Sequence, residues 1–200
     1  MTTRSSGLTP QPSAPTGSGR QVRVECGADG RPLGRDPELV TLLGEYQDAV
    51  VRSHHLDAVT TELVRLRCAR QHDCRICQTL RLADAAESGV DEGMAGKVDH
   101  YERSDLAERH KVALRIVDAF IWRPADMSDE LVEQAHGQFS DAELAELLLD
   151  ITKWSTQKIH VALGTDGADR LAVGEAGVSY FTFDEEGRAT GFTPTHAPAT

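Results

Sequence analysis

Residues 72–78 read HDCRICQ and place Cys74 and Cys77 three positions apart in a chain that has only four cysteines. Cysteines this close together can form a redox couple, hold a metal ion or simply pack in the core. Positions i and i+3 of a helix lie next to each other on one face, so the two sulfur atoms can meet there. We therefore expect Cys74 and Cys77 to form a reversible disulfide.

The residues that flank this pair predict the local fold. Asp73 is suited to cap a helix that begins at Cys74. That helix is expected to run to about Glu87 and to end at Gly89. The unpaired N–H groups of its first turn and the charge of Arg75 would stabilise a thiolate and lower the pKa of a thiol. Because the effect fades within one turn, helix electrostatics alone favours Cys74 as the cysteine with the lower pKa.

The rest of the chain carries a succession of helix signals. Pro37 is suited to a first helical position, Ser128 to an N-cap, and Ser140 with Glu143 to a capping box. Apolar residues recur at helical spacing after each signal, and Gly164 ends the last run. Helices are expected at residues 37–53, 56–70, 105–122, 129–139 and 141–163. The sequence thus predicts an all-α helical bundle.

Both ends of the chain differ from this central part. Residues 1–20 are rich in Ser, Thr, Pro and Gly, and we expect a disordered tail there. Residues 21–165 would form the helical domain. Residues 166–200 form a C-terminal extension with two β-prone runs, GVSYFTF at 177–183 and EEGRATGFT at 185–193. A small hairpin or an arm is expected in this extension.

Composition excludes several classes of partner and location. The chain has 200 residues, with 21 Lys and Arg against 32 Asp and Glu, a net charge of -11 that disfavours nucleic acid and anionic membranes. No run is long and apolar enough to cross a bilayer, and no signal peptide is evident, so we expect a soluble cytoplasmic protein. Four cysteines are too few for a secreted disulfide scaffold, and a close pair in a reducing compartment is catalytic or metal-binding more often than structural.

Glu62 is the second unusual residue. It falls on the apolar face of a predicted helix, where a carboxylate must find a partner or shift its pKa. Arg81 lies four residues after Cys77, and in a continuous helix it would share one face with both cysteines. We expect the two helices to bring Glu62 and Arg81 together as a buried or half-buried ion pair.

The order of Glu62, Cys74 and Cys77 across a helix, a loop and a second helix resembles the alkylhydroperoxidase D and carboxymuconolactone decarboxylase family. Redox-active members of that family carry a Glu, then C-x-x-C, then a His four residues later. The resemblance spans about Pro37 to Gly164. It includes the later segment LAERHKVALRIVDAFIWRPADMSDELVEQAHGQFSDAELAELLLDITKWSTQKIHVALG, in which the helix starts SDE and FSDAE occur in the family's order.

The resemblance implies an all-α fold assembled as trimers or hexamers and a thiol-dependent peroxidase or disulfide oxidoreductase. Cys77 would be the attacking thiolate, Cys74 the resolving cysteine and Glu62 part of a proton relay. The substrate would be a hydroperoxide or a small disulfide, and a dithiol or protein reductant would recycle the enzyme. No metal and no organic cofactor would be needed.

One position departs from the family pattern. The family's His falls on Arg81, which can steady a thiolate but cannot shuttle a proton near neutral pH. His72 lies close to the cysteines in sequence and is the candidate to replace it as the titrating group. Two alternatives therefore stay open. The chain could be a non-catalytic oligomeric module that binds a small molecule or a protein, or an acid–base enzyme of the decarboxylase type that leaves the cysteines idle.

The remaining cysteines do not extend the site. Cys68 is most simply a small hydrophobic residue of the core, and Cys26 lies in the N-terminal stretch. Cys68 and His72 add two zinc-ligand types to the pair, but closed zinc sites use two short ligand pairs placed well apart. This spacing disfavours a metal site.

Overall fold

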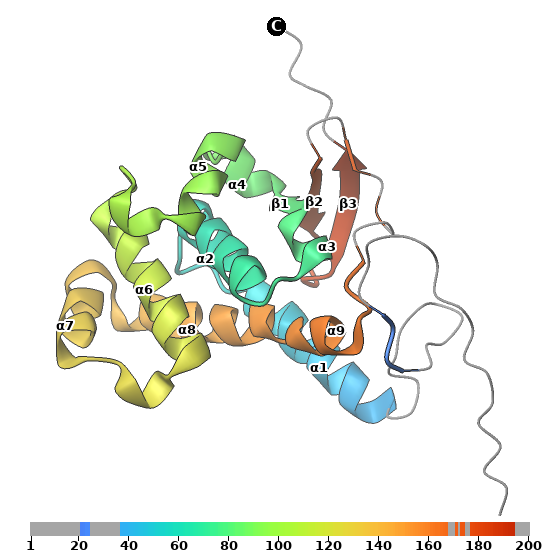
Figure 1. Ribbon diagram of the computed structural model, residues 1–200, viewed down its shortest axis with the longest axis horizontal. Coiled ribbons are helices and arrows are strands. Elements are labelled where there is room, and N and C mark those ends of the chain that lie inside the picture. The colour runs from blue at the N-terminus through green and yellow to red at the C-terminus, as the bar shows by residue number, and fades with distance from the viewer. Residues whose placement is uncertain (1–20, 25–36, 168–170, 172, 175–176, 195–200) are drawn as a thin grey trace, which may run out of the picture.

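The computed structural model describes residues 21–24, 37–167, 171, 173–174 and 177–194 (Figure 1). Cys26 and the tail expected at 1–20 lie outside these residues. The described chain is mostly helical. Its longer helices are α1 (Pro37–Val51), α2 (Ala58–Gln71), α6 (Glu108–Trp122), α7 (Asp129–Gln138) and α8 (Asp141–Ser155). The shorter ones are α3 (Arg75–Gln78), α4 (Ala83–Glu87), α5 (Glu92–Gly96), α9 (Lys158–Leu163) and the 3-10 turns η1 (Lys97–Asp99), η2 (Tyr101–Arg103) and η3 (Pro124–Asp126).

Local capping signals fix several helix ends. The Ser128 side chain accepts a hydrogen bond from the N–H of Leu131 at the start of α7. Ser140 and Glu143 form the predicted capping box of α8, and Gly164 ends α9 with φ of 72°. The predicted helix over 141–163 is interrupted between Ser155 and Lys158, so it forms α8 and α9. These ends depend on groups close in sequence, which is why sequence patterns found them.

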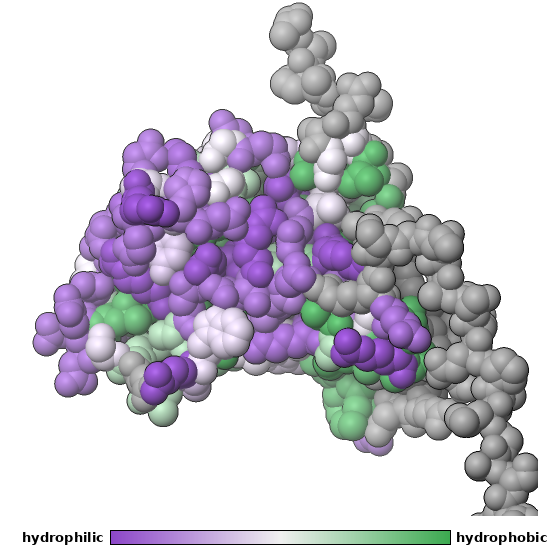
Figure 2. Space-filling model, viewed as in Figure 1, coloured by the Kyte–Doolittle hydropathy of each residue, from purple (hydrophilic) through white to green (hydrophobic). Residues whose placement is uncertain are grey.

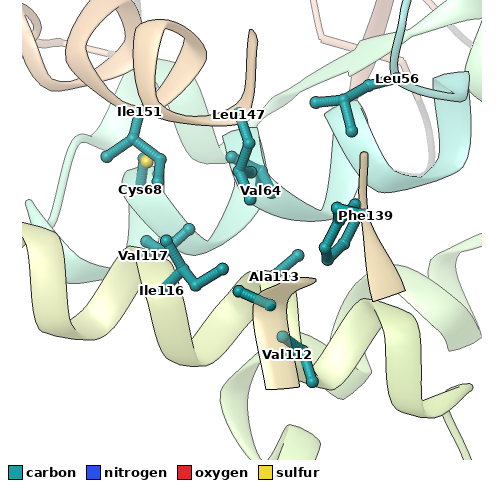
Figure 3. Packing of buried hydrophobic residues seen from close by; sticks show 11 residues of the cluster. Leu56, Val64, Cys68, Val112, Ala113, Ile116, Val117, Phe139, Leu147 and Ile151 are labelled. Carbon is teal, nitrogen blue, oxygen red and sulfur yellow. The ribbon is translucent and has the colours of Figure 1, made fainter. Parts of the chain in front are cut away.

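The main core lies where α2 packs against α6 and α8 (Figure 3). Val64 and Cys68 of α2 face Leu147 and Ile151 of α8 across this contact (Figure 3). The buried cluster comprises Leu56, Val64, Cys68, Val112, Ala113, Ile116, Val117, Ala135, Phe139, Leu147 and Ile151. Removing each large apolar side chain from water contributes about 1.5–3 kcal/mol. The prediction that Cys68 is a core residue is confirmed, since its side chain is buried and free.

The helix predicted from Cys74 to Glu87 is wrong. Only α3 and α4 are helical in this range, and strand β1 (Leu80–Leu82) separates them. Asp73 does not cap α3, because it adopts φ of 51° and Cys74 is the N-cap. Pairing with a distant strand gives the β1 backbone the hydrogen bonds that a continued helix would have given it.

That strand belongs to a three-stranded sheet of order β1-β2-β3, which adds a small β part to the predicted bundle. β1 pairs in parallel with β2 (Ser179–Phe183), with Leu80 opposite Ser179 and Leu82 opposite Phe181. β2 pairs antiparallel with β3 (Ala189–Pro194), so the C-terminal extension contains a hairpin. Figure 1 shows this hairpin beside β1, next to α3. The extension therefore lies against the segment that carries the two cysteines.

The described surface is largely hydrophilic in the view of Figure 2. Apolar side chains gather over the first half of α1, where Leu39 and Leu42 are exposed (Figure 2). Within the described ranges, no helix combines the length and the apolar character that crossing a membrane requires. The trimer or hexamer implied by the resemblance stays a prediction.

Candidate redox site

Cys74 and Cys77 are joined by a disulfide at the start of α3, with 5.3 Å between their Cα atoms. Cys74 is fully buried, whereas Cys77 is half-buried. The backbone N–H of Cys77 donates to Sγ of Cys74 over 3.3 Å. Cys68 takes no part in the bond, and burial raises the pKa of its thiol far above the usual value. Of these three cysteines, Cys77 is therefore the one that a solvent-borne reagent can approach.

Glu62 lies in α2 and is 1% exposed. Both of its carboxylate oxygens are bound by Arg65, at 2.6 Å from Nε and 2.7 Å from Nη2. Arg65 is itself 3% exposed and also donates to the backbone carbonyls of Cys77, at 3.0 Å, and Leu80. One guanidinium thus connects the buried carboxylate to both ends of the segment from Cys77 to β1.

Arg65 was not among the site residues predicted from the sequence, although the sequence carries a signal for it. Arg65 follows Glu62 by three residues in the same helix, a spacing at which side chains are neighbours. The expected ion pair between Glu62 and Arg81 is wrong. The expected pair required contact between two helices, whereas Glu62 finds its partner, Arg65, within its own helix.

Arg81 is also buried, but it makes other contacts. It lies in β1, and its Nε and Nη2 each donate to the Glu92 carboxylate over 2.8 Å. Its Nη1 donates to the carbonyls of Gln78 and Leu80. Because β1 interrupts the helix, the predicted helical face shared by Arg81 and the two cysteines does not exist. The structure gives Arg81 the role of anchoring the segment after α3 to α5.

His72 caps the C-terminus of α2, two residues before Cys74. Among the described residues, neither nitrogen of its half-buried ring has a hydrogen-bond partner. Burial, with a smaller contribution from the nearby charge of Lys158, lowers the pKa of His72 to about 4. The imidazole is therefore neutral at pH 7. It borders a cavity of about 310 Å³ lined by Gln71, His72, Ile121, Trp122, Lys158, Val161 and Ala162.

This pKa predicts a specific loss of stability in acid. His72 binds a proton more weakly in the folded than in the unfolded chain, so its contribution is complete above about pH 6.5 and is lost as the pH falls toward 4. We expect the free energy of unfolding to fall by about 1 kcal/mol over this range, a value reduced for the ring's partial exposure. Urea denaturation at neutral pH and near pH 4 measures it. His72→Gln should remove this pH-dependent loss of stability. The control His54→Gln, at an exposed position, should keep it. A pH dependence that is unchanged in His72→Gln would show that the loss does not come from His72.

A second group of buried charges lies on α8. Burial, reinforced by the charge of Glu146, raises the pKa of Asp150 to about 7. Burial lowers the pKa of Lys153 to about 7, although Asp150 opposes this shift. The Lys153 ammonium lies 5.3 Å from the ring centre of Phe183 in the hairpin. These residues were not predicted from the sequence, because the burial of a charged helical side chain is decided by tertiary packing, here that of α8 against α1 and α2.

The C-terminal extension contacts α3 directly through Asp166, which is fully buried. One carboxylate oxygen of Asp166 accepts the N–H of Arg75 at 3.0 Å, and the Asp166 carbonyl accepts the N–H of Ile76 at 3.2 Å. The Arg75 guanidinium also reaches this carboxylate, with a closest contact of 3.3 Å. Beyond α3, the N–H of Ser179 donates to the carbonyl of Thr79 at 2.8 Å. The extension therefore holds both flanks of the disulfide segment.

No cluster of three or more His, Cys, Asp and Glu side chains able to hold a metal ion occurs in the described part of the chain. The constellation that does occur combines a disulfide, a buried carboxylate–guanidinium pair and a second carboxylate at α3. These groups support thiol chemistry, in which a cysteine sulfur is the reacting atom.

Comparison with curated proteins found relatives without an assigned function, and no protein-family model matches the chain. The uncharacterized proteins MT2376 and Rv2313c, from two strains of Mycobacterium tuberculosis, are each 40% identical over 143 residues. The match covers 68% of this chain and 50% of each relative, so the chain spans about half the length of the curated relatives it matches.

Similarity to solved structures identifies the fold. ATU0492 from Agrobacterium tumefaciens, a protein of unknown function linked by name to the antioxidant defence protein AhpD, superposes with a TM-score of 0.54 and 22% identity over 64% of this chain and 88% of that one. A cysteine-to-alanine variant of the debrominase Bmp8, bound to 2,3,4-tribromopyrrole, superposes with a TM-score of 0.55 and 15% identity over 66% and 72% of the two chains. At such low identity the likeness concerns architecture and not activity. The chain adopts the alkylhydroperoxidase D-like fold.

Proposed function

We propose that the chain is a thiol oxidoreductase in which Cys74 and Cys77 alternate between a dithiol and a disulfide. The observation that carries this proposal is the bonded pair, with Cys77 half-buried and Cys74 fully buried, on a fold shared with AhpD-named and debrominase structures. An accessible attacking cysteine beside an enclosed resolving cysteine is the asymmetry that such a cycle requires. Exposure therefore supports the roles that the family resemblance implied.

The reaction that fits these groups best is disulfide exchange. The Cys77 thiolate attacks one sulfur of a substrate disulfide and expels the other as a thiolate, which leaves a mixed disulfide on Cys77. The Cys74 thiol, after losing its proton to solvent, attacks Sγ of Cys77 and expels the second substrate thiolate. The substrate gains two electrons and, from water, two protons. A dithiol reductant reopens the Cys74–Cys77 bond by the same two steps.

Disulfides are favoured over hydroperoxides because the candidate proton donors among the described residues are bound to other groups or neutral. Cleaving a peroxide O–O bond releases an alkoxide that a general acid normally protonates, whereas a thiolate leaves without help. Both oxygens of Glu62 are bound to Arg65, and Arg81 is held by Glu92. His72 is neutral at pH 7 and thus a poor acid. We therefore assign Glu62 a structural role in place of the proton relay expected from the family.

Hydroperoxide reduction is the second candidate, because a half-buried Cys77 is open to a small peroxide. Its thiolate would attack one peroxide oxygen and form a sulfenic acid and an alcohol. Cys74 would then displace water from the sulfenic acid to close the disulfide. The two candidates form different intermediates on Cys77, a mixed disulfide or a sulfenic acid, and share the Cys74–Cys77 disulfide and its reduction by a dithiol.

The deciding experiment measures how fast the reduced protein is oxidised. Protein stripped of reductant is mixed with hydroxyethyl disulfide or with cumene hydroperoxide, and closure of the Cys74–Cys77 bond is followed by mass spectrometry after acid quenching. We expect the disulfide to oxidise the pair at least about a hundredfold faster, the lower end of what a missing general acid costs.

Cys68→Ala, which removes only a core thiol, should react like the wild-type chain. Faster oxidation by the hydroperoxide would favour the second candidate. Two titratable thiols that neither reagent oxidises would favour the non-catalytic binding module.

A further inference from the structure

Asp166 binds the backbone between the two cysteines. The backbone N–H groups of Arg75 and Ile76 lie between the two cysteines in the chain. Both donate to Asp166, one to its carboxylate and one to its carbonyl. The Arg75 side chain, the nearest cation in sequence, also pairs with the carboxylate of Asp166.

We propose that Asp166 is a positioning residue that lowers the reactivity of the reduced Cys74–Cys77 pair. It does so by placing a buried negative charge beside the cysteines and by binding the guanidinium and N–H groups that lie between them. The inference rests on the proposed function and adds a regulatory part to it, the C-terminal extension. Gly164, with φ of 72°, turns the chain after α9, and Asp166 two residues later lies against α3. Beyond Asp166, the pairing of β1 with β2 fastens the extension to the other flank of the cysteines.

The other titratable and charged groups near the pair are paired, neutral or screened by solvent. Arg65 of α2 donates to the Cys77 carbonyl but is neutralised by Glu62. His72, at the end of α2, is neutral at pH 7. Asp73 is exposed to solvent, which screens its charge. Among the carboxylates of the described residues, Asp166 is both fully buried and hydrogen-bonded to the C-x-x-C backbone.

Two variants should shift the pKa of the reactive thiol in opposite directions. Asp166→Asn keeps the shape and an accepting oxygen for the N–H of Arg75, but it removes the negative charge and releases the guanidinium. The pKa of the reactive cysteine should then fall by about one pH unit, the size expected for one nearby charge at a partly screened site. Arg75→Gln removes the cation beside the cysteines, so the same pKa should rise by about one unit.

The test compares these variants as full chains after reduction and removal of the reductant. The rate of alkylation of Cys77 by iodoacetamide is measured against pH, with the site verified by mass spectrometry. At pH 7, Asp166→Asn should react about threefold faster than the wild-type chain, because a tenfold gain in thiolate is partly offset by its lower nucleophilicity. Arg75→Gln should react more slowly. Glu102→Gln, which removes a carboxylate paired with Arg115 at 2.7 Å on η2 and α6, should leave the profile unchanged.

Opposite shifts in the two variants would support the proposal. Equal signs, or no shift in either variant, would overturn it, because a merely structural contact would not respond to the sign of the charge. If Asp166→Asn fails to fold, Arg75→Gln alone decides, with a raised pKa supporting the proposal and an unchanged one overturning it. The measurement requires no turnover, so a protein that oxidises neither substrate would refute the proposed function without affecting this result.

Discussion

Replacing Cys77 with serine should lower the dithiol-dependent reduction of a small disulfide by at least about 10³-fold, because it removes the attacking thiolate. Cys74 should not substitute for it, since its side chain is fully buried against the protein. The measurement is steady-state turnover with hydroxyethyl disulfide and an excess of dithiothreitol, corrected for the uncatalysed exchange.

Cys74→Ser should behave differently from Cys77→Ser. Cys77 can still attack the substrate, but no resolving thiol follows, so half of the substrate should stay attached to Cys77 as a mixed disulfide. Intact-protein mass spectrometry detects this adduct. Cys68→Ala is the matched control and should retain full turnover. Normal turnover in Cys77→Ser, or an adduct on Cys74 in that variant, would reverse the assigned roles.

The second large effect concerns stability. Arg65→Met should lower the free energy of unfolding by about 3–5 kcal/mol, because the Glu62 carboxylate would stay buried without its partner. The substitution also removes hydrogen bonds to the carbonyls of Cys77 and Leu80. Such a loss is a large fraction of the roughly 5–15 kcal/mol that stabilises a typical domain. Guanidinium denaturation of the oxidised protein measures it.

A double variant separates the ion pair from the packing around it. Glu62→Gln with Arg65→Met removes both charges and should recover much of the loss seen in Arg65→Met alone. Arg115→Met is the matched control, since Arg115 pairs with Glu102 and Glu108 at the surface and should cost no more than about 1 kcal/mol. A loss in Arg65→Met no greater than in Arg115→Met would show that the buried pair is not an anchor of the site.

The candidate site was only partly predictable, because some of its contacts join residues close in sequence and others join distant segments. The spacing of Cys74 and Cys77 predicted their bond, because one helical turn places their sulfur atoms together whatever surrounds them. The partner of Glu62 was also local, at Arg65. Family resemblance directed attention to Arg81 instead, and this position turned out to bind Glu92 of α5.

Sequence alone determined the features that depend on neighbouring residues: the capping box at Ser140, the end of α9 at Gly164, the apolar faces of the long helices and the C-x-x-C turn. Tertiary structure alone decided that 80–82 would be a strand, because β2, about 100 residues later, supplies its hydrogen bonds. It also placed Asp166 on α3, 91 residues from Arg75. Helical periodicity reports which side chains share a face, but it carries no information about the backbone groups that a distant segment will satisfy.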